Sequence, residues 1–419
     1  MAKSETIAAL DIGTSKVACA FAEFYREGDV RIEVKAHSEI DCREINGAGI
    51  NFLALGDVVE ELFDRMEKDQ QMENVVVGLS SEYVGCSLYR EHKIAIGGSD
   101  IEQEHIDCVL KAAKSIECPE NREIIKIVPR TYSVDNNLDI VNPLGMFAYG
   151  LGVGAYYCFG ATTYIENMKQ MLRNAGLSVD ADKGKFLIFP SSMASAVAVL
   201  GAEEKEREVA VVDIGHGNLD LAIYSGQQII YSNVLGCGGL NLINDIARQF
   251  NVSEDSANNL LLQEGLAGVD CLEDEDRYKA LAAELVYGKS TEIIKEELVR
   301  TIEARLDEFL KWIEDQFEHV YQNFGVRVAS MVLTGGVAQL PKIEVKFNEV
   351  LKLPVRIGKP CSLSKLPVGL DKVTSSTVTG LLTCGIDELS FCKNAKKSTT
   401  KLSWFWDLLY KIFPSLPKV

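Results

Sequence analysis

Two stretches far apart in the chain share a pattern of an aspartate and glycines between two apolar runs. The first is AALDIGTSKVACAFAEF at 8–24, and the second is AVVDIGHGNLDLAIYSG at 210–226. In each, a carboxylate ends one predicted strand and glycine opens a tight turn into the next strand. Such a turn can bring backbone N–H groups against phosphate while the carboxylate faces a metal ion. The repeat predicts two similar domains that face each other across one site.

The residues expected at this site come from four places. They are Asp11, Gly13, Thr14, Ser15 and Lys16 in the first turn; Asp213, Gly215, His216, Gly217 and Asn218 in the second; Gly238, Gly239 and Asn241 where a predicted helix begins; and Gly335, Gly336 and Val337 after a predicted strand. Helix starts favour anions, because free N–H groups and the helix dipole both point there. Each turn alone is equally well explained as a tight hairpin that needs glycine. The four together favour a nucleotide cleft.

The elements that position these turns read as two α/β halves. Strands are expected at 7–11, 17–24, 75–79, 209–212, 219–224, 229–235 and 328–333, with helices at 52–68, 291–321 and 374–384. Residues 83–161 have a different pattern of expected elements from the two halves. A short strand at 93–96, a helix after Asp100, strands at 124–129 and 132–134, and a glycine-rich loop at 143–154 predict an inserted piece.

Composition excludes several classes of protein. At 419 residues the chain is too long for a single core. A net charge of −18 argues against a nucleic-acid partner, whose binding face would be basic. The 11 cysteines are scattered singly, which favours reduced thiols in a cytosol over a disulfide framework. We expect no signal peptide and no membrane-spanning helix, because no apolar run is long enough.

The C-terminal segment has the pattern of a helix that lies in a membrane surface. Residues 393–401 form a polar, lysine-rich linker, and 402–416 carry an apolar stripe flanked by tryptophans. The expected membrane-binding residues are Lys401, Trp404, Phe405, Trp406, Leu408, Leu409, Lys411, Ile412 and Phe413. Such a helix is too short to cross a bilayer but suits an anionic headgroup layer. The alternative is a C-terminal helix docked on the protein's own core.

The set of motifs resembles the actin-like ATPase superfamily, which also contains sugar kinases and heat-shock ATPases. Within it, the chain resembles the FtsA family of bacterial cell-division proteins. The resemblance rests on ALDIGTSKVACAFAE, ENREIIKIVPRTYSVDN, AVVDIGHGNLDLAIYSGQQIIYSNVL and the C-terminal amphipathic segment, and it covers nearly the whole chain. It implies an actin-like, ribonuclease H-like duplicated two-lobed α/β fold with an inserted subdomain and a C-terminal amphipathic helix.

The resemblance also implies a division into subdomains. They are 1–82 and 162–200 (subdomain 1A of the first lobe), 83–161 (inserted subdomain 1C), 201–226 and 301–392 (subdomain 2A of the second lobe), 227–300 (subdomain 2B), the basic linker 393–401 and the membrane-targeting helix 402–416.

By the same resemblance, the chain is expected to bind ATP and Mg²⁺ between its lobes, with Asp11 and Asp213 approaching the metal. It is expected to polymerise with copies of itself and to hold the C-terminal peptide of FtsZ at the cytoplasmic face of the bacterial inner membrane. Later division proteins are the further partners that it implies. The FtsZ contact is expected within subdomain 2B.

Several residues depart from the family pattern. His216 stands in the second turn where the family has glycine, and Phe189 stands where a glutamate would orient the attacking water. Asn258 and Leu261 replace a glutamate and a lysine that meet the nucleoside. These changes predict weakened ATP binding and slow or absent hydrolysis. An active actin-like ATPase or kinase, and a PilM-like adaptor of a pilus assembly system, remain the alternatives.

Overall fold

The computed structural model describes residues 4–25, 31–42, 51–65, 74–80, 84–113, 115–140, 142–177, 185–363 and 365–397. The expected membrane-binding residues, which run from Lys401 to Phe413, lie outside these ranges. Within the described ranges, no helix combines the length and the apolar character needed to span a bilayer.

The first turn lies in a five-stranded sheet. Its strands are β1 (Glu5–Ile12), β2 (Lys16–Tyr25), β3 (Arg31–Asp41), β4 (Asn74–Leu79) and β9 (Lys185–Pro190), in the order β3-β2-β1-β4-β9. The valine run of β4 is buried along its whole length, as an apolar central strand should be. β1 pairs antiparallel with β2 and parallel with β4, so that Asp11 has Ala18 on one side and Gly78 on the other.

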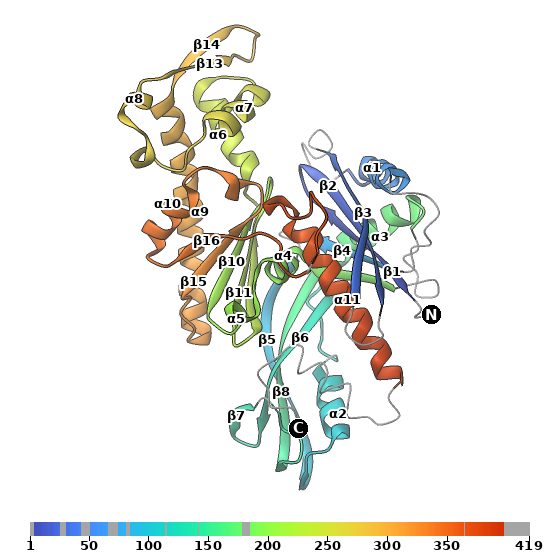
Figure 1. Cartoon of the computed structure of the whole chain (residues 1–419). Coiled ribbons are helices and arrows are strands. Elements are labelled where there is room, and N and C mark those ends of the chain that lie inside the picture. Colours follow the sequence, from blue (N-terminus) through green and yellow to red (C-terminus); the bar gives the residue numbers. More distant parts are fainter. Residues whose placement is uncertain are drawn as a thin grey trace.

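The second turn lies in a sheet built the same way. The part that matches the first sheet consists of β10 (Val209–Ile214), β11 (Leu219–Ser225), β12 (Gln228–Leu235), β15 (Ser330–Thr334) and β16 (Val355–Ile357), in the order β12-β11-β10-β15-β16. The strands of the inserted piece extend this sheet beyond β12 to nine strands. Asp213 lies opposite Asp220 in the antiparallel pair and beside Thr334 in the parallel pair. The predicted duplication is therefore confirmed strand by strand (Figure 1). Asp11 and Asp213 have equivalent positions in the strand registers.

The inserted piece adds four strands and one helix. They are β5 (Val84–Asp100), β6 (Arg122–Val134), β7 (Asn137–Ile140), β8 (Phe147–Ala161) and α2 (Gln103–Ala113). The glycine-rich loop predicted at 143–154 was wrong, because most of it belongs to β8, which pairs with both β5 and β6. Glycine is needed there for close packing: a Cβ at Gly152 would lie 2.2 Å from the hydroxyl of Ser133. The short strands predicted at 93–96, 124–129 and 132–134 are parts of the longer β5 and β6.

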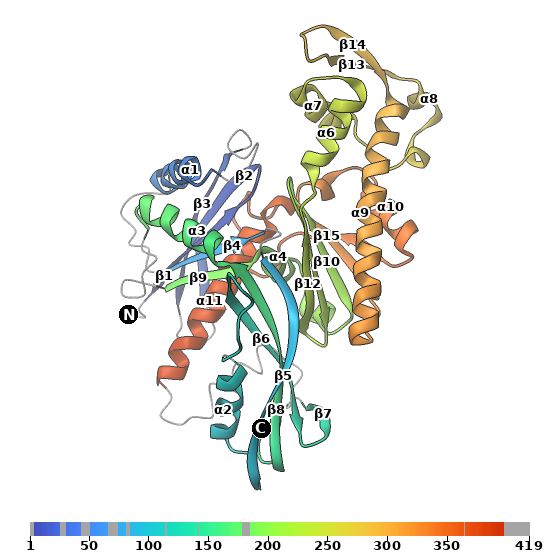
Figure 2. The ribbon, with the colours of Figure 1, turned by 180° about the vertical axis from the view of Figure 1, so that it is seen from behind.

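Helices cover the sheets and extend the second half. They are α1 (Phe52–Arg65), α3 (Thr162–Asn174), α4 (Ser191–Val199), α5 (Ala202–Lys205), α6 (Gly239–Phe250), α7 (Glu254–Glu264), α8 (Asp274–Arg277), α9 (Lys295–Phe324), α10 (Ile343–Leu351) and α11 (Ser376–Lys397). Short 3₁₀ turns occur at Val269–Cys271, Val337–Gln339 and Val373–Ser375, and β13 (Ala280–Glu284) pairs with β14 (Ser290–Ile294). The inserted piece and the β13–β14 hairpin lie at opposite ends of the molecule (Figures 1 and 2).

Helix α11 is longer than the sequence indicated. The helix predicted over 374–384 continues through Lys397, so the first part of the segment expected to be a linker is helical. Ile386 and Leu389 continue the buried stripe of Leu382 beyond the predicted end. α11 crosses α4 very closely, since a Cβ at Gly380 would lie 1.8 Å from the carbonyl oxygen of Ala194.

Among the cysteines whose side chains the structure describes, all but one are reduced. Eight are free thiols, namely Cys19, Cys42, Cys108, Cys118, Cys237, Cys271, Cys361 and Cys384. Cys158 of β8 is disulfide-bonded, so the expectation of reduced thiols fails at that position. In the backbone register of β5 and β8, Cys158 lies opposite Cys86.

Candidate functional site

The two turns have the same backbone geometry. The N–H of Gly13 donates to the carbonyl of Lys16 at 3.0 Å, and the N–H of Gly215 donates to the carbonyl of Asn218 at 2.9 Å. The turns also meet: a Cβ at Gly217 would lie 2.6–3.0 Å from side-chain atoms of Thr14. Gly217 is therefore required by the close approach of the other half.

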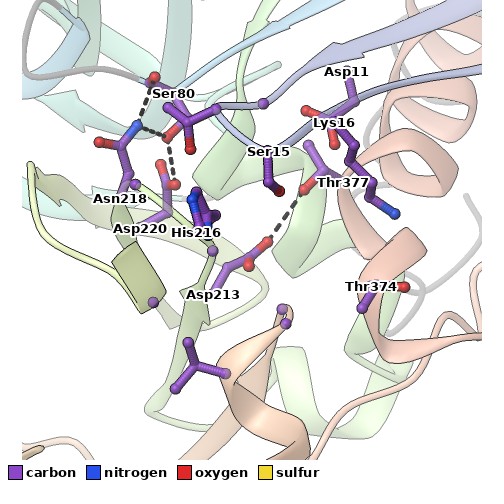
Figure 3. A pocket seen from close by; sticks show the side chains of 18 of the residues that line it. Asp11, Ser15, Lys16, Ser80, Asp213, His216, Asn218, Asp220, Thr374 and Thr377 are labelled. Carbon is purple, nitrogen blue, oxygen red and sulfur yellow. Dashed lines mark hydrogen bonds between the residues drawn. The ribbon is translucent and has the colours of Figure 1, made fainter. Parts of the chain in front are cut away.

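A cavity of about 670 Å³ opens between the two halves. Fourteen of the sixteen predicted site residues line it: Asp11, Gly13, Thr14, Ser15, Lys16, Asp213, Gly215, His216, Gly217, Asn218, Gly239, Gly335, Gly336 and Val337. The sequence thus located the cavity from both halves. Figure 3 shows Asp11, Ser15 and Lys16 facing Asp213 and His216 across it.

The other two predicted residues act behind the cavity wall. Gly238 N–H donates to the side-chain oxygen of Asn241 at 2.9 Å, which closes the start of α6. The N–H of Gly239 donates to the carbonyl of Gly215 at 2.9 Å, and that of Leu240 to the carbonyl of His216 at 2.7 Å. The first turn of α6 is thereby tied to the second glycine turn.

Asp213 is held by hydroxyl groups from two helices. The Ser195 hydroxyl of α4 donates to its carboxylate at 2.5 Å, and Thr377 of α11 donates to the same oxygen at 3.2 Å. Burial raises the pKa of Asp213, while these two hydrogen bonds and Lys16 oppose the rise. The sequence did not predict either hydroxyl residue, although 373–379 reads VTSSTVT, a hydroxyl-rich start to a helix.

Asp11 faces the same cavity from the first half. Burial raises the pKa of Asp11 to about 7, and the Asp213 carboxylate adds to the rise, whereas Lys16 lowers it. Lys16 itself forms an ion pair with Glu39 of β3 at 2.6 Å. Two carboxylates that favour their protonated form in a shared cavity are a place where a cation would be stabilising.

A third carboxylate, Asp220, was not predicted. It is buried, and one of its oxygens accepts a hydrogen bond of 2.6 Å from the Ser80 hydroxyl at the end of β4. Its other oxygen has no hydrogen-bond partner among the described residues. Burial first, and then Asp213, raise the pKa of Asp220 well above its ordinary value. The sequence could have indicated Ser80, because it is a polar residue directly after a buried parallel strand.

Asn218 joins this network. Its side-chain N–H₂ group donates to the Ser80 carbonyl oxygen at 2.9 Å and to the Ser80 hydroxyl at 3.0 Å (Figure 3). Ser80 directly follows β4 of the first sheet, whereas Asn218 ends the turn before β11 of the second sheet and Asp220 lies in β11. The amide of Asn218 therefore connects the two halves.

The third glycine pair packs under Asp213. Gly335 has φ +86°, and a Cβ there would lie 2.2 Å from an oxygen of Asp213. At Gly336 a Cβ would meet nothing within 4 Å. Only the first glycine of the pair is required by its surroundings.

The far end of the cavity is mainly apolar. It is lined by Leu242 and Ile243 of α6, Asn258, Leu261 and Leu262 of α7, and Leu340 and Pro341. Asn258, Leu261 and Leu262 have the i, i+3, i+4 spacing of one helix face. The two positions at which the chain departs from the family pattern on α7 thus both face the cavity.

Phe189 lies elsewhere. Its side chain is buried in the core beneath α11, with the ammonium group of Lys126 4.5 Å from the ring centre, and it does not line the cavity. A side chain at this position of β9 therefore points away from the cavity. A glutamate at position 189 could therefore not reach a ligand in the cavity without a change in this packing.

The donor set suits Mg²⁺ only as part of a complex with phosphate. No three His, Cys, Asp or Glu side chains gather closely enough to hold a metal ion in the described part of the chain. Mg²⁺ commonly takes one or two carboxylates and completes its shell with phosphate oxygens and water. Asp11 and Asp213 could supply those carboxylates.

Comparison with known proteins identifies the family. A family model described as "Cell division protein FtsA" matches residues 210–382, and one described as "SHS2 domain inserted in FTSA" matches residues 86–157. The chain belongs to the FtsA family. It is 27% identical over 390 residues to the cell division protein FtsA of Escherichia coli K12, covering 90% of each chain. It is 28% identical over 400 residues to that of Borreliella burgdorferi, covering 94% of each.

Solved structures confirm the actin-like fold. The chain superimposes on a PilM–PilN type IV pilus biogenesis complex with a TM-score of 0.61 and 17% identity, covering 91% of this chain and 98% of that one. It superimposes on MreB5 of Spiroplasma citri bound to ADP with a TM-score of 0.52 and 13% identity, covering 94% of this chain and 99% of that one. At these identities the likeness shows the fold alone. The FtsA family match makes this chain a cell-division protein of the actin-like family.

Proposed function

We propose that this division protein anchors FtsZ polymers to the cytoplasmic face of the bacterial membrane and assembles with copies of itself at the division site. The cavity between two duplicated halves, both lined by aspartate–glycine turns, is the observation that carries the nucleotide-dependent part of this proposal. The FtsA relatives support the division role. FtsZ binding within 227–300 and recruitment of later division proteins are inferred from the resemblance.

The cavity would take ATP with its phosphates between the two turns. Backbone N–H groups of the turns, the hydroxyls of Thr14 and Ser15 and the ammonium group of Lys16 would meet the phosphates. Asp11 and Asp213 would hold Mg²⁺, which neutralises phosphate charge when bound. The nucleoside would lie against the apolar face formed by α6 and α7. The structure of MreB5 bound to ADP, which has a similar fold, supports nucleotide binding by this chain.

We infer that the bound nucleotide regulates the protein and is turned over slowly or not at all. Hydrolysis needs a group that orients the attacking water. Phe189 cannot supply one, because it is apolar and packed under α11. The Oδ2 atom of Asp213 already accepts from two hydroxyl donors. An active ATPase is the alternative, and turnover that is abolished by Asp213→Asn would favour it.

The membrane part of the proposal rests on the sequence of the tail. From 393 to 419 there are six lysines against one aspartate, whereas the whole chain is strongly acidic. Each large apolar side chain that enters the headgroup layer contributes about 1.5–3 kcal/mol, and each lysine near an anionic surface about 1 kcal/mol. Ordering the segment offsets much of that gain. One tail should bind reversibly, and a filament that presents many tails should bind firmly.

The test is co-sedimentation of FtsZ polymers with anionic liposomes. The full chain should carry FtsZ to the liposome pellet, and a chain that ends at Lys397 should leave both proteins in the supernatant. Leu409→Glu on the apolar stripe should act like the truncation, and Ser403→Glu off the stripe should act like the full chain. Equal liposome binding by the full and truncated chains would refute the membrane proposal. Membrane binding without FtsZ would refute the anchoring proposal.

A further inference from the structure

Three hydrogen bonds cross from the second half to Ser80 of the first half, beside the proposed nucleotide site. Asn218 donates to the Ser80 carbonyl at 2.9 Å and to its hydroxyl at 3.0 Å, and that hydroxyl donates to Asp220 at 2.6 Å. The Ser80 hydroxyl thus accepts from an amide and donates to a carboxylate. In these three hydrogen bonds each donor group has its own acceptor, so the directions of the bonds are mutually consistent.

The residues of this hydrogen-bond network are largely shielded from water, so breaking its hydrogen bonds is costly. Asp220 is 6% exposed, and Ser80 and Asn218 are partly buried. If the halves separated here, Asp220 would lose the one hydrogen bond that its side chain makes among the described residues. A buried carboxylate oxygen without a donor is costly, so separation is opposed until water can reach the site.

Asn218 connects the hydrogen-bond network to the second glycine turn. Asn218 is the residue whose carbonyl closes the second glycine turn by accepting from Gly215. Its counterpart in the first turn is Lys16, which closes that turn in the same way. One residue therefore both ends the second turn and fastens it to the first half. The close packing of Gly217 on Thr14 adds a contact between the two turns at the same place.

We propose that Asn218 is a positioning residue that fixes the spacing of the two glycine turns by fastening the second to Ser80, so that the cleft is closed before any ligand enters. The contact itself lies within the chain; only its consequence for a nucleotide rests on the proposed function. A closed ligand-free cleft means that nucleotide binds to a site already formed. It also means that ligand binding changes the relative position of the halves little.

Amide hydrogen exchange on the ligand-free full chain tests the contact. Asn218→Ala should speed exchange about tenfold in 74–80 and 209–225, where the halves meet, and leave the distant helix 295–324 unchanged. Asn258→Ala is the matched control, because it makes the same change at another residue that lines the cavity, on α7 and without a hydrogen bond to Ser80. Ser80→Ala should give part of the effect, and adding it to Asn218→Ala should give less than the product of the two single effects. Equal exchange in Asn218→Ala and Asn258→Ala would overturn the proposal.

Addition of Mg-ATP separates this inference from the proposed function. In the original chain, Mg-ATP should change exchange at 74–80 less than about twofold, and in Asn218→Ala it should restore most of the lost protection. A tenfold gain of protection in the original chain would show an open cleft that the ligand closes, and would contradict the proposal. Absence of any ATP binding would count against the nucleotide site, while the ligand-free comparison would still decide the role of Asn218.

Discussion

Asp213 and Asp220 lie directly opposite each other in the antiparallel pair β10–β11, and both are buried. Facing residues in such a pair have Cβ atoms about 4.5–5.5 Å apart, and like charges placed there repel. The equivalent pair in the first half is Asp11 and Ala18, which avoids the repulsion. The second half therefore places two buried carboxylates side by side in the cavity lining, and the proposed role of Mg²⁺ is to relieve the repulsion that their ionisation would cause.

This arrangement predicts how stability depends on pH. Asp11, Asp213 and Asp220 all have a raised pKa in the folded protein, so the folded state binds more protons than the unfolded state. Their contribution to stability is present below the unfolded pKa, near 4, and is lost as pH rises through the folded value, about 7 for Asp11.

Asp11→Asn should therefore flatten the fall in the free energy of unfolding between pH 5.5 and 8, measured by urea denaturation in the absence of nucleotide and Mg²⁺. Asp57→Asn, on the exposed face of α1, should leave the slope as it is. An unchanged slope in Asp11→Asn would contradict the assignment.

The glycine pair after β15 offers a second test. Gly335→Ala should destabilise the protein by about 1–3 kcal/mol and weaken ATP binding, because the new methyl group would clash with Asp213 at a backbone angle that favours glycine. Gly336→Ala should change stability by less than about 0.5 kcal/mol, since its Cβ meets open space. Thermal denaturation of the two variants, together with ATP titration, compares them directly. Equal effects would mean that contact with Asp213 is not what constrains Gly335.

A third prediction concerns the hydroxyls that hold Asp213. Thr377→Val keeps the shape of the side chain and removes a donor to a buried carboxylate, so it should cost about 1–3 kcal/mol. Thr301→Val is the control, because the Thr301 hydroxyl bonds only to the carbonyl of its own helix at the exposed surface. Its loss should cost well under 1 kcal/mol. Chemical denaturation measures both losses. The difference between the two variants should be larger at pH 8 than at lower pH, because the carboxylates are then more fully ionised.

A fourth prediction concerns Phe189. Restoring a glutamate there should not restore hydrolysis, because the side chain points into the core beneath α11. Phe189→Glu should instead destabilise the protein by a few kcal/mol, since it buries a carboxylate in an apolar core beside Lys126, whose ammonium group is already paired with Glu388. Phe189→Leu should cost less, because it keeps an apolar side chain in the same place. A gain of ATP turnover in Phe189→Glu would show that this residue can reach the cavity.

The sequence predicted the parts of the fold that short-range patterns encode. Aspartate–glycine turns between apolar strands located the cavity, because glycine suits a tight turn and neighbouring strand ends present carboxylates at one edge of a sheet. It missed β8, since Gly150 and Gly152 resemble loop residues although they allow close packing in a sheet. It missed Ser80 and Thr377 because single hydroxyl residues gain their role only when distant elements meet. At Phe189 the family pattern led us to expect a side chain in the cavity, whereas the structure places it in the core beneath α11.

The measurement that tests the central claim most directly is ATP binding by calorimetry with and without Mg²⁺, followed by phosphate release on the same sample. We predict that ATP binds at one site per chain, that Mg²⁺ strengthens binding, and that turnover stays at or below about 10⁻³ per second, the range of a GTPase without its activating arginine. Asp213→Asn should weaken the effect of Mg²⁺. No binding at millimolar ATP, or turnover near one per second that Asp213→Asn abolishes, would contradict a cleft that senses nucleotide without consuming it.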